Sequence, residues 1–168
     1  DIMSSGLTAE DQSLLQGRLH TLGRSILSGN VAYVGVDLHS INSGSSDDAK
    51  AVDVVGLVAN HLPHVQDVDL SDNQLTDVNA LKRNHALTTL KLKDNRLTDL
   101  NAFAALPVVD NGTNTDADAV HVNVVVGRRT LQHLDASCNL LTALPSKLSC
   151  TYLTHLNLSH NSLRNLGS

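Results

Sequence analysis

Apolar side chains recur along this chain in one pattern with a period of 22 residues. Residues 65–78 and 87–100 share it at all six specified positions, and it returns at 131–144 and 153–166. A fixed period of this length is the signature of a solenoid. The matching positions are Val65, Val68, Leu70, Asn73, Leu75 and Val78; Leu87, Leu90, Leu92, Asn95, Leu97 and Leu100; Leu131, Leu134, Ala136, Asn139, Leu141 and Leu144; and Leu153, Leu156, Leu158, Asn161, Leu163 and Leu166.

The spacing within one repeat predicts its local structure. Two apolar residues two positions apart, such as Val68 and Leu70, lie on the same side of a short strand. The asparagine, such as Asn73, falls where the chain turns away, and its amide can bond the backbone there. Burying each leucine is worth about 1.5–3 kcal/mol, but a single coil cannot bury its own apolar faces. The chain is therefore predicted to be an α/β solenoid with one parallel strand per coil.

The repeat is interrupted between 107 and 130. The period would place a coil at Val109, but it puts Gly112, Asn114 and Ala117 on specified positions. Residues 110–118 are polar and rich in turn formers, whereas V-H-V-N-V-V-V at 120–126 is typical of a strand. We favour an insertion at about 107–130 that contains a β segment, and a degenerate third coil is the alternative. Regular coils are predicted over 65–106 and 131–168.

The N-terminal third does not follow the repeat. Apolar residues at helical spacing predict a helix over 8–27, with Thr8 as N-cap and Gly29 as its stop. Residues 31–38 are typical of a strand. A second helix is expected to begin in the polar residues 43–48 and to end at Pro63. These elements define an N-terminal helical cap over 1–30 and an irregular first coil over 31–64, within a repeat domain of 31–168.

Composition narrows the function classes. Charged residues make up 17% of the chain and the net charge is -5, so we expect no broad basic surface for nucleic acid or for membranes. Cys138 and Cys150 have neither the number nor the spacing of a disulfide framework or zinc motif, which favours a reduced, intracellular compartment. The last apolar positions have no coil after them, which predicts that further chain or a partner subunit seals that end.

Side chains between the inward positions of each strand should point outward and form a protein-binding face. In such a sheet, adjacent strands lie about 4.8 Å apart, so Asp69 should neighbour Lys91. A solvated polar face without a partner is the alternative interpretation. The outward residues are Asp67, Asp69, Ser71, Thr89, Lys91, Lys93, His133, Asp135, Ser137, His155, Asn157 and Ser159.

Neither metal binding nor catalysis is predicted on this face. His133, Asp135 and His155 should cluster on neighbouring coils, and such ligands suit zinc. Exposed histidines are the simpler interpretation in a chain that contains nine. No serine or cysteine nucleophile stands beside a base with an oxyanion donor, and no phosphate-binding or dinucleotide motif occurs. We therefore predict no catalytic, cofactor or metal site and no enzyme activity.

Two motifs carry a family resemblance. D-V-D-L-S-D-N-Q-L at 67–75 and K-L-K-D-N-R-L at 91–97 are similar to leucine-rich repeats of the 22-residue class, typified by regulatory subunits of protein phosphatase 1. The resemblance covers 65–106 and 131–166. It implies a parallel sheet on the concave face, with short helices or 3-10 turns on the convex face. It is specific for the fold and says little about the activity.

The order of the N-terminal elements resembles that of a narrower group of leucine-rich-repeat proteins. A helix, then Y-V-G-V-D-L at 33–38 and the two motifs above, resembles leucine-rich-repeat proteins of the ciliary axoneme, those of the radial spoke in particular. The 43–62 helix and the insertion depart from them. The resemblance implies a structural scaffold in a large protein assembly of the cilium or flagellum, within the cytoplasm or cytoskeleton. Regulation of a phosphatase is one alternative. A ribonucleoprotein component is another, because the small nuclear ribonucleoprotein A-prime has a similar opening.

Overall fold

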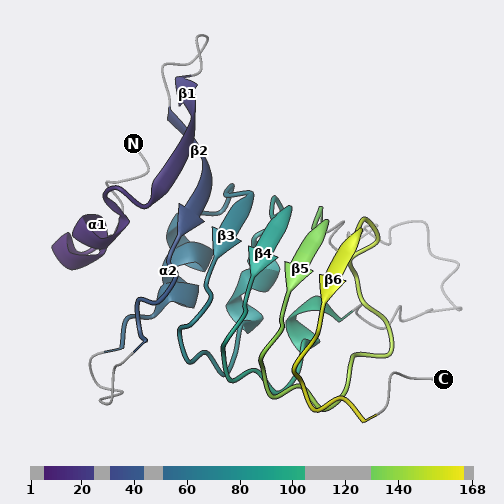
Figure 1. Ribbon diagram of the computed structural model, residues 1–168. Helices are drawn as coiled ribbons and strands as arrows, with labels where there is room; N and C mark the ends of the chain where they lie inside the picture. Colours follow the sequence, from purple (N-terminus) through teal and green to yellow (C-terminus); the bar gives the residue numbers. More distant parts are fainter. Residues whose placement is uncertain (1–5, 25–30, 44–50, 105–129, 165–168) are drawn as a thin grey trace, which may run out of the picture.

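The computed structural model describes residues 6–24, 31–43, 51–104 and 130–164. Their strands form one six-stranded sheet in the order β1-β2-β3-β4-β5-β6 (Figure 1). β1 pairs with β2 antiparallel, and each later strand pairs parallel with the one before it. The strands are β1 (Leu19–Arg24), β2 (Val31–Asp37), β3 (Asp67–Asp69), β4 (Thr89–Lys91), β5 (His133–Asp135) and β6 (His155–Asn157).

The short strands confirm the register predicted from the repeat. Val68 is paired with Leu90, Leu90 with Leu134, and Leu134 with Leu156. β4 and β5 are therefore direct neighbours, although two repeat periods of sequence separate Leu90 from Leu134. Residues 105–129, which hold most of the predicted insertion, lie outside the described residues, so its interpretation stays a prediction.

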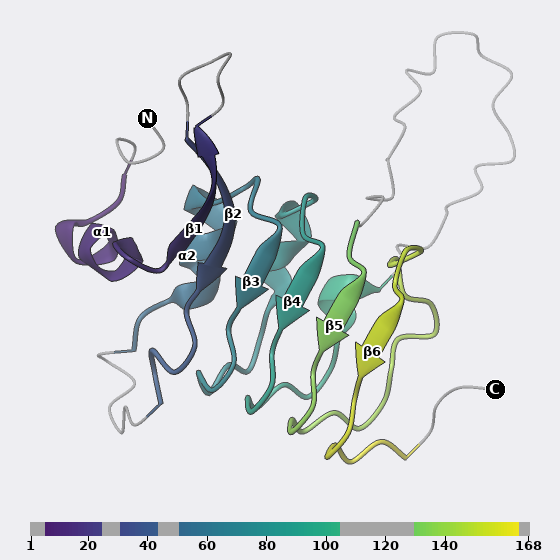
Figure 2. The same cartoon turned by 45° about the horizontal axis from the view of Figure 1, so that its top comes forward.

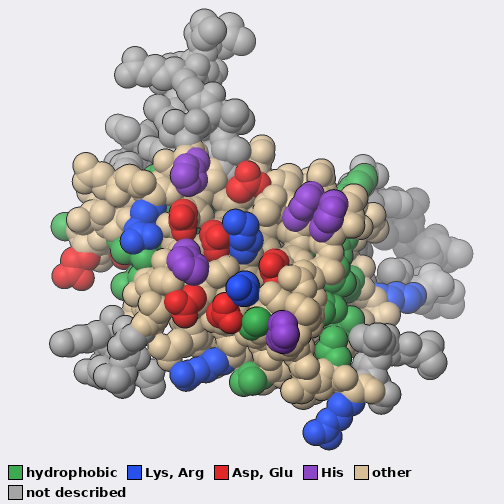
Figure 3. Space-filling model, in the orientation of Figure 1, with side chains coloured by type: hydrophobic (Ala, Val, Ile, Leu, Met, Phe, Trp, Pro, Cys, Tyr) green, Lys and Arg blue, Asp and Glu red, His purple; other side chains and the backbone are tan. Residues whose placement is uncertain are grey.

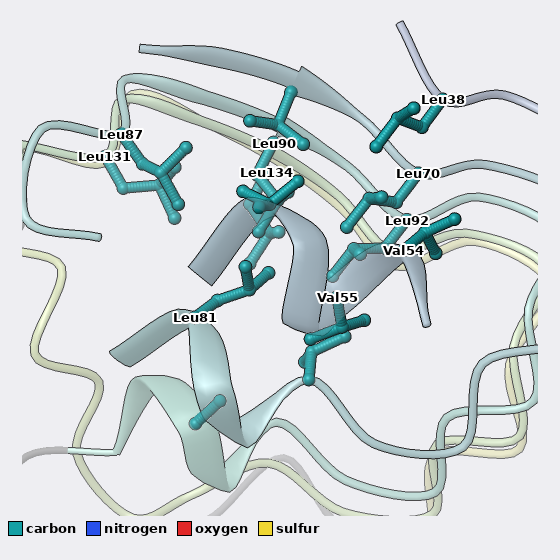
Figure 4. Packing of buried hydrophobic residues seen from close by; sticks show 14 of the residues in the cluster. Leu38, Val54, Val55, Leu70, Leu81, Leu87, Leu90, Leu92, Leu131 and Leu134 are labelled. Atoms are coloured by element: carbon teal, nitrogen blue, oxygen red, sulfur yellow. The ribbon is translucent and has the colours of Figure 1, made fainter. Parts of the chain in front are cut away.

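The side of the sheet that its inward side chains face carries short helical segments (Figure 2). They are α2 (Val54–His61) and the 3-10 turns η3 (Asn79–Arg83) and η4 (Asn101–Phe103). Between them and the strands lies an aliphatic core, in which Leu90 and Leu134 lie side by side, as do Leu87 and Leu131 (Figure 4). The sheet and its few helical segments fit an α/β solenoid.

Asparagines at the turns connect successive coils. Asn95 and Asn139 are buried, and the Asn139 side chain accepts the backbone N–H of Leu97 at 3.0 Å. Its amide group donates to the carbonyl of Leu92 in the preceding coil at 2.9 Å. These bonds satisfy polar backbone groups that the turn would otherwise bury without partners. These bonds confirm the prediction that the asparagine of each repeat binds the backbone at the turn.

The N-terminal helix is shorter than the sequence predicts. α1 (Ala9–Leu15) begins at the expected N-cap Thr8, whose side chain accepts the backbone N–H of Asp11 at 3.1 Å. The prediction of helix through residue 27 is wrong, because Leu19–Arg24 is strand β1. Gly17 adopts φ +82° after the helix, a conformation that suits glycine. Antiparallel pairing with β2 then satisfies the backbone that a longer helix would have paired internally. The predicted stop at Gly29 lies outside the described residues.

The second helix also begins later than expected. α2 starts at Val54, and the Asp53 side chain caps it by accepting the Gly56 N–H at 2.8 Å. Val52 precedes the helix, and its backbone N–H donates to Asn42 Oδ1 at 2.9 Å. Because residues 51–53 are not helical, the prediction of one helix running from 43–48 into this region is wrong. Residues 44–50 themselves lie outside the described part. The helix ends at His61, before Pro63, as predicted.

Candidate functional site: the outer sheet face

The outward side chains of β3 to β6, together with Asp37 of β2, form a surface that we call the outer sheet face. The parallel register aligns them in columns across the strands. One column contains Asp67, Thr89, His133 and His155, and the next contains Asp37, Asp69, Lys91, Asp135 and Asn157. Figure 3 views this face and shows acidic, basic and histidine side chains distributed over it.

The predicted binding residues differ in exposure. Asp67, Lys91, Lys93, His133, His155, Asn157 and Ser159 are exposed, and Thr89, Asp69 and Asp135 are half-buried. Ser71 and Ser137 are only 7% and 2% exposed. The expectation that these two serines contribute exposed surface is wrong, because they lie where the chain bends into the buried turn.

Local hydrogen bonds hold the second column in place. Asp69 Oδ1 accepts the backbone N–H of Ser71 at 3.0 Å, and Asp135 Oδ1 accepts that of Ser137 at 3.0 Å. Asn157 Oδ1 likewise accepts the backbone N–H of Ser159 at 3.2 Å. A side chain that bonds the backbone two residues later stabilises a turn. The coils therefore present these polar groups at a fixed and repeated position.

The expected neighbours Asp69 and Lys91 form an ion pair. Lys91 Nζ lies 3.2 Å from Asp69 Oδ2. Burial of Asp69 acts to raise its pKa, but the hydrogen bonds from Ser71 and the contact with Lys91 outweigh burial and lower the pKa below its ordinary value. Lys91 is more than half exposed, so the pair contributes at most about 1 kcal/mol to stability. Its charges remain accessible to a partner.

Two histidines lie side by side at the C-terminal part of the face. The rings of His133 and His155 are stacked, with centroids 4.3 Å apart and planes inclined by 15° (Figure 3). Thr154 Oγ1 lies 2.9 Å from His155 Nδ1 and 3.1 Å from the carbonyl of Gln132. A shallow hollow of about 500 Å³ extends from this pair to Lys91 on β4.

A smaller hollow of about 220 Å³ lies at the N-terminal part of the face, over Gly35. His20, Asp37 and Asp67 border it. Gly35, His20 and Asp37 lie outside the face that the sequence predicts. Asp37 could have been found, because V-D-L at 36–38 repeats V-D-L at 68–70. His20 could not, because its apolar neighbours have helical spacing and predict a helix there.

Two features of the described residues bear on reactivity, namely the grouping of potential metal ligands and the state of the Cys138 thiol. Within those ranges no group of three or more His, Cys, Asp or Glu is placed to hold a metal ion. Partial desolvation and the nearby Asp94 carboxylate raise the pKa of the Cys138 thiol, which disfavours its nucleophilic thiolate form. No helix in the described part of the chain has the length and apolar character to cross a membrane.

Comparison with known proteins agrees with the geometry. Residues 61–78 and 149–167 match the model of a family described as "Leucine Rich repeat". The first match includes β3 and the second includes β6. No curated protein matches the chain. The two matches indicate a leucine-rich-repeat protein, and repeats of this kind generally mediate protein–protein interaction without catalysis.

Proposed function

We propose that this leucine-rich-repeat protein is a non-catalytic scaffold whose protein partner binds the outer sheet face. The observation that carries the proposal is the alignment of outward polar side chains in columns across β3 to β6. Each of these strands carries at least one exposed side chain at an outward position, so the spacing of the contacts is set by the sheet. A partner can bind such a surface without first ordering it, which reduces the entropic cost of association.

The mixed charge of the face suits a polar protein surface. Acidic side chains on β3 and β5 flank basic side chains that follow or lie on β4; they are Asp67, Asp69 and Asp135 and Lys91 and Lys93. Basic and acidic groups of a partner can therefore both find an opposite charge on this face. Charge complementarity of this kind favours specificity and rapid association. With a net charge of -5, the chain is not suited to direct binding of nucleic acid or of an acidic membrane surface.

The proposed setting is a structural assembly of the ciliary or flagellar axoneme, specifically the radial spoke, in the cytoplasm or cytoskeleton. The support is the sequence order of Y-V-G-V-D-L at 33–38 followed by the two repeat motifs. Affinity purification from ciliated and unciliated cells tests the setting. Recovery of spoke proteins only from ciliated cells is the expected result. Recovery of phosphatase catalytic subunits or spliceosomal proteins instead would contradict it.

A charge-matched pair of variants tests the binding face. Lys91→Glu with Lys93→Glu reverses two charges on the outer sheet face, and we expect it to reduce partner capture at least 10-fold. Lys82→Glu with Arg83→Glu reverses two exposed charges in η3, on the other side of the sheet, and should leave capture unchanged. Equal capture by both double variants, or loss only in the η3 variant, would contradict the assignment.

A further inference from the structure

We propose that His133 and His155 are the two protein ligands of a divalent transition-metal site, open to solvent, on the outer sheet face. The ions that suit it are Ni²⁺, Zn²⁺ and Cu²⁺, because imidazole nitrogen is a good ligand for all three. The inference goes beyond the proposed scaffold function and does not depend on it. The stacked ring pair, which the sequence alone does not show, changes the interpretation of these two histidines as ordinary surface residues.

The two rings are close enough to bind one ion after they turn. Each Zn–N bond is about 2.0–2.1 Å long, so two nitrogens on one ion are at most about 4.2 Å apart. The ring centroids are 4.3 Å apart and the ring planes are nearly parallel, so the rings must rotate before two nitrogens point at one ion. Both side chains are exposed, which leaves room for that rotation. The strands that carry them are paired at these residues, His133 with His155. The backbone therefore holds the two ligands together before an ion binds.

Thr154 contacts the His155 ring at Nδ1. A threonine hydroxyl has one hydrogen to donate, and Thr154 Oγ1 lies 3.1 Å from the carbonyl of Gln132 and 2.9 Å from His155 Nδ1. When the hydroxyl donates to the carbonyl, Nδ1–H donates to Oγ1. In that tautomer of the neutral ring, Nε2 carries the lone pair that an ion would take. A bond from the other ring nitrogen to a fixed partner is how metal-ligating histidines are oriented.

The hollow beside the pair is lined by one acidic and one basic side chain, Asp135 and Lys91. Asp135 follows His133 by two residues on the same strand, and the two hydrogen bonds it receives from Ser137 both go to Oδ1. Lys91, which also lines the hollow, is drawn to Asp69 on β3. The hollow of about 500 Å³ has room for water molecules on the ion. Because the described residues supply no third ligand, those positions stay open.

Calorimetric titration of residues 1–168 with Ni²⁺ and with Zn²⁺ tests the site. We expect one ion per chain, with affinity lowered at least 10-fold in His133→Gln and in His155→Gln. The control is His39→Gln with His64→Gln, which changes two exposed histidines away from the stacked pair and should bind as the wild type does. Wild-type affinity in either site variant, or equal loss in the control, would overturn the proposal. Far-UV circular dichroism confirms that each variant is folded.

Two further readouts separate a chelating pair from nonspecific binding. An ion that joins β5 to β6 should raise the Tm of the wild type but not of the double variant His133→Gln with His155→Gln. Absence of that difference would overturn bridging by the pair. Thr154→Val should weaken binding several-fold, and unchanged affinity would overturn the positioning role of Thr154. These measurements use the isolated chain, so failure of the scaffold proposal would leave their results unaffected.

Discussion

The side-chain Oδ1 of Asn95 accepts the backbone N–H of Asn73, one coil earlier, at 3.1 Å. The same oxygen accepts the N–H of Leu75 at 2.9 Å. The amide nitrogen of Asn95 donates to the carbonyls of Leu70 and Leu92, both at 3.0 Å. One buried side chain thus closes its own turn and joins it to the turn before.

Replacing Asn95 with alanine should destabilise the protein by about 2–4 kcal/mol. Each buried backbone group left without a partner costs about 1–3 kcal/mol, and Asn95 serves groups in two coils. The measurement is the urea midpoint of unfolding. Asn101→Ala, at an exposed position in η4, is the matched control and should change the midpoint little. An unchanged midpoint for Asn95→Ala would show that the asparagine is not structural.

Leucine truncation should have a position-dependent cost along the solenoid. Leu90 and Leu156 occupy the same place in their coils, but Leu90 is fully buried and Leu156 is 40% exposed. Leu90→Ala should cost about 2–5 kcal/mol, the usual range for a buried leucine, and Leu156→Ala should cost less than half as much. Denaturant titration of the two variants checks this. Equal costs would mean that Leu156 is as buried in solution as Leu90.

The contribution of Asp69 to stability should depend on pH. Its folded-state pKa lies below the ordinary value of 3.8. The unfolded chain therefore binds the proton more tightly, and the stabilisation is present above the unfolded pKa and is lost as the pH falls through the folded pKa. Asp69→Asn should lower the free energy of unfolding by about 1 kcal/mol at pH 7 and by less near pH 2.5. Equal destabilisation at both pH values would contradict the assignment.

Gly17 should be sensitive to substitution for conformational reasons alone. Its φ is +82°, and a Cβ built there meets nothing within 4 Å. Gly17→Ala should therefore cost about 1–2 kcal/mol from the left-handed backbone rather than from a clash. Gly17→Asn is the control, because asparagine tolerates this region better, and it should cost less. The Tm of the two variants provides the comparison, and a more stable alanine variant would contradict it.

Shortening the segment between η4 and β5 should leave the solenoid folded. β4 and β5 are paired directly, and the free energy of closing a loop changes slowly with its length. Deletion of 110–118 should therefore shift the Tm by only a few degrees, as measured by thermal unfolding beside the wild type. Complete unfolding of the deletion variant would support the alternative of a degenerate third coil.

The repeat itself could be predicted from sequence because its information is local and recurs. A leucine at each inward position and an asparagine at each turn specify the coil, its strand and its register with the next coil. Leu90 and Leu134 are paired as their spacing predicts, and the Asp69–Lys91 ion pair follows from the same register. The candidate face was also predictable in outline, since outward positions alternate with inward ones.

Tertiary structure decided the features that depend on pairing between distant segments. Leu19–Arg24 has helical spacing but forms β1, because β2 supplies an antiparallel partner. Ser71 lies on an outward position but is only 7% exposed. The stacking of His133 on His155 follows from side-chain orientation as well as register. Periodicity determined which residues face inward, whereas packing determined which outward residues remain exposed, because exposure depends on what the neighbouring coils cover.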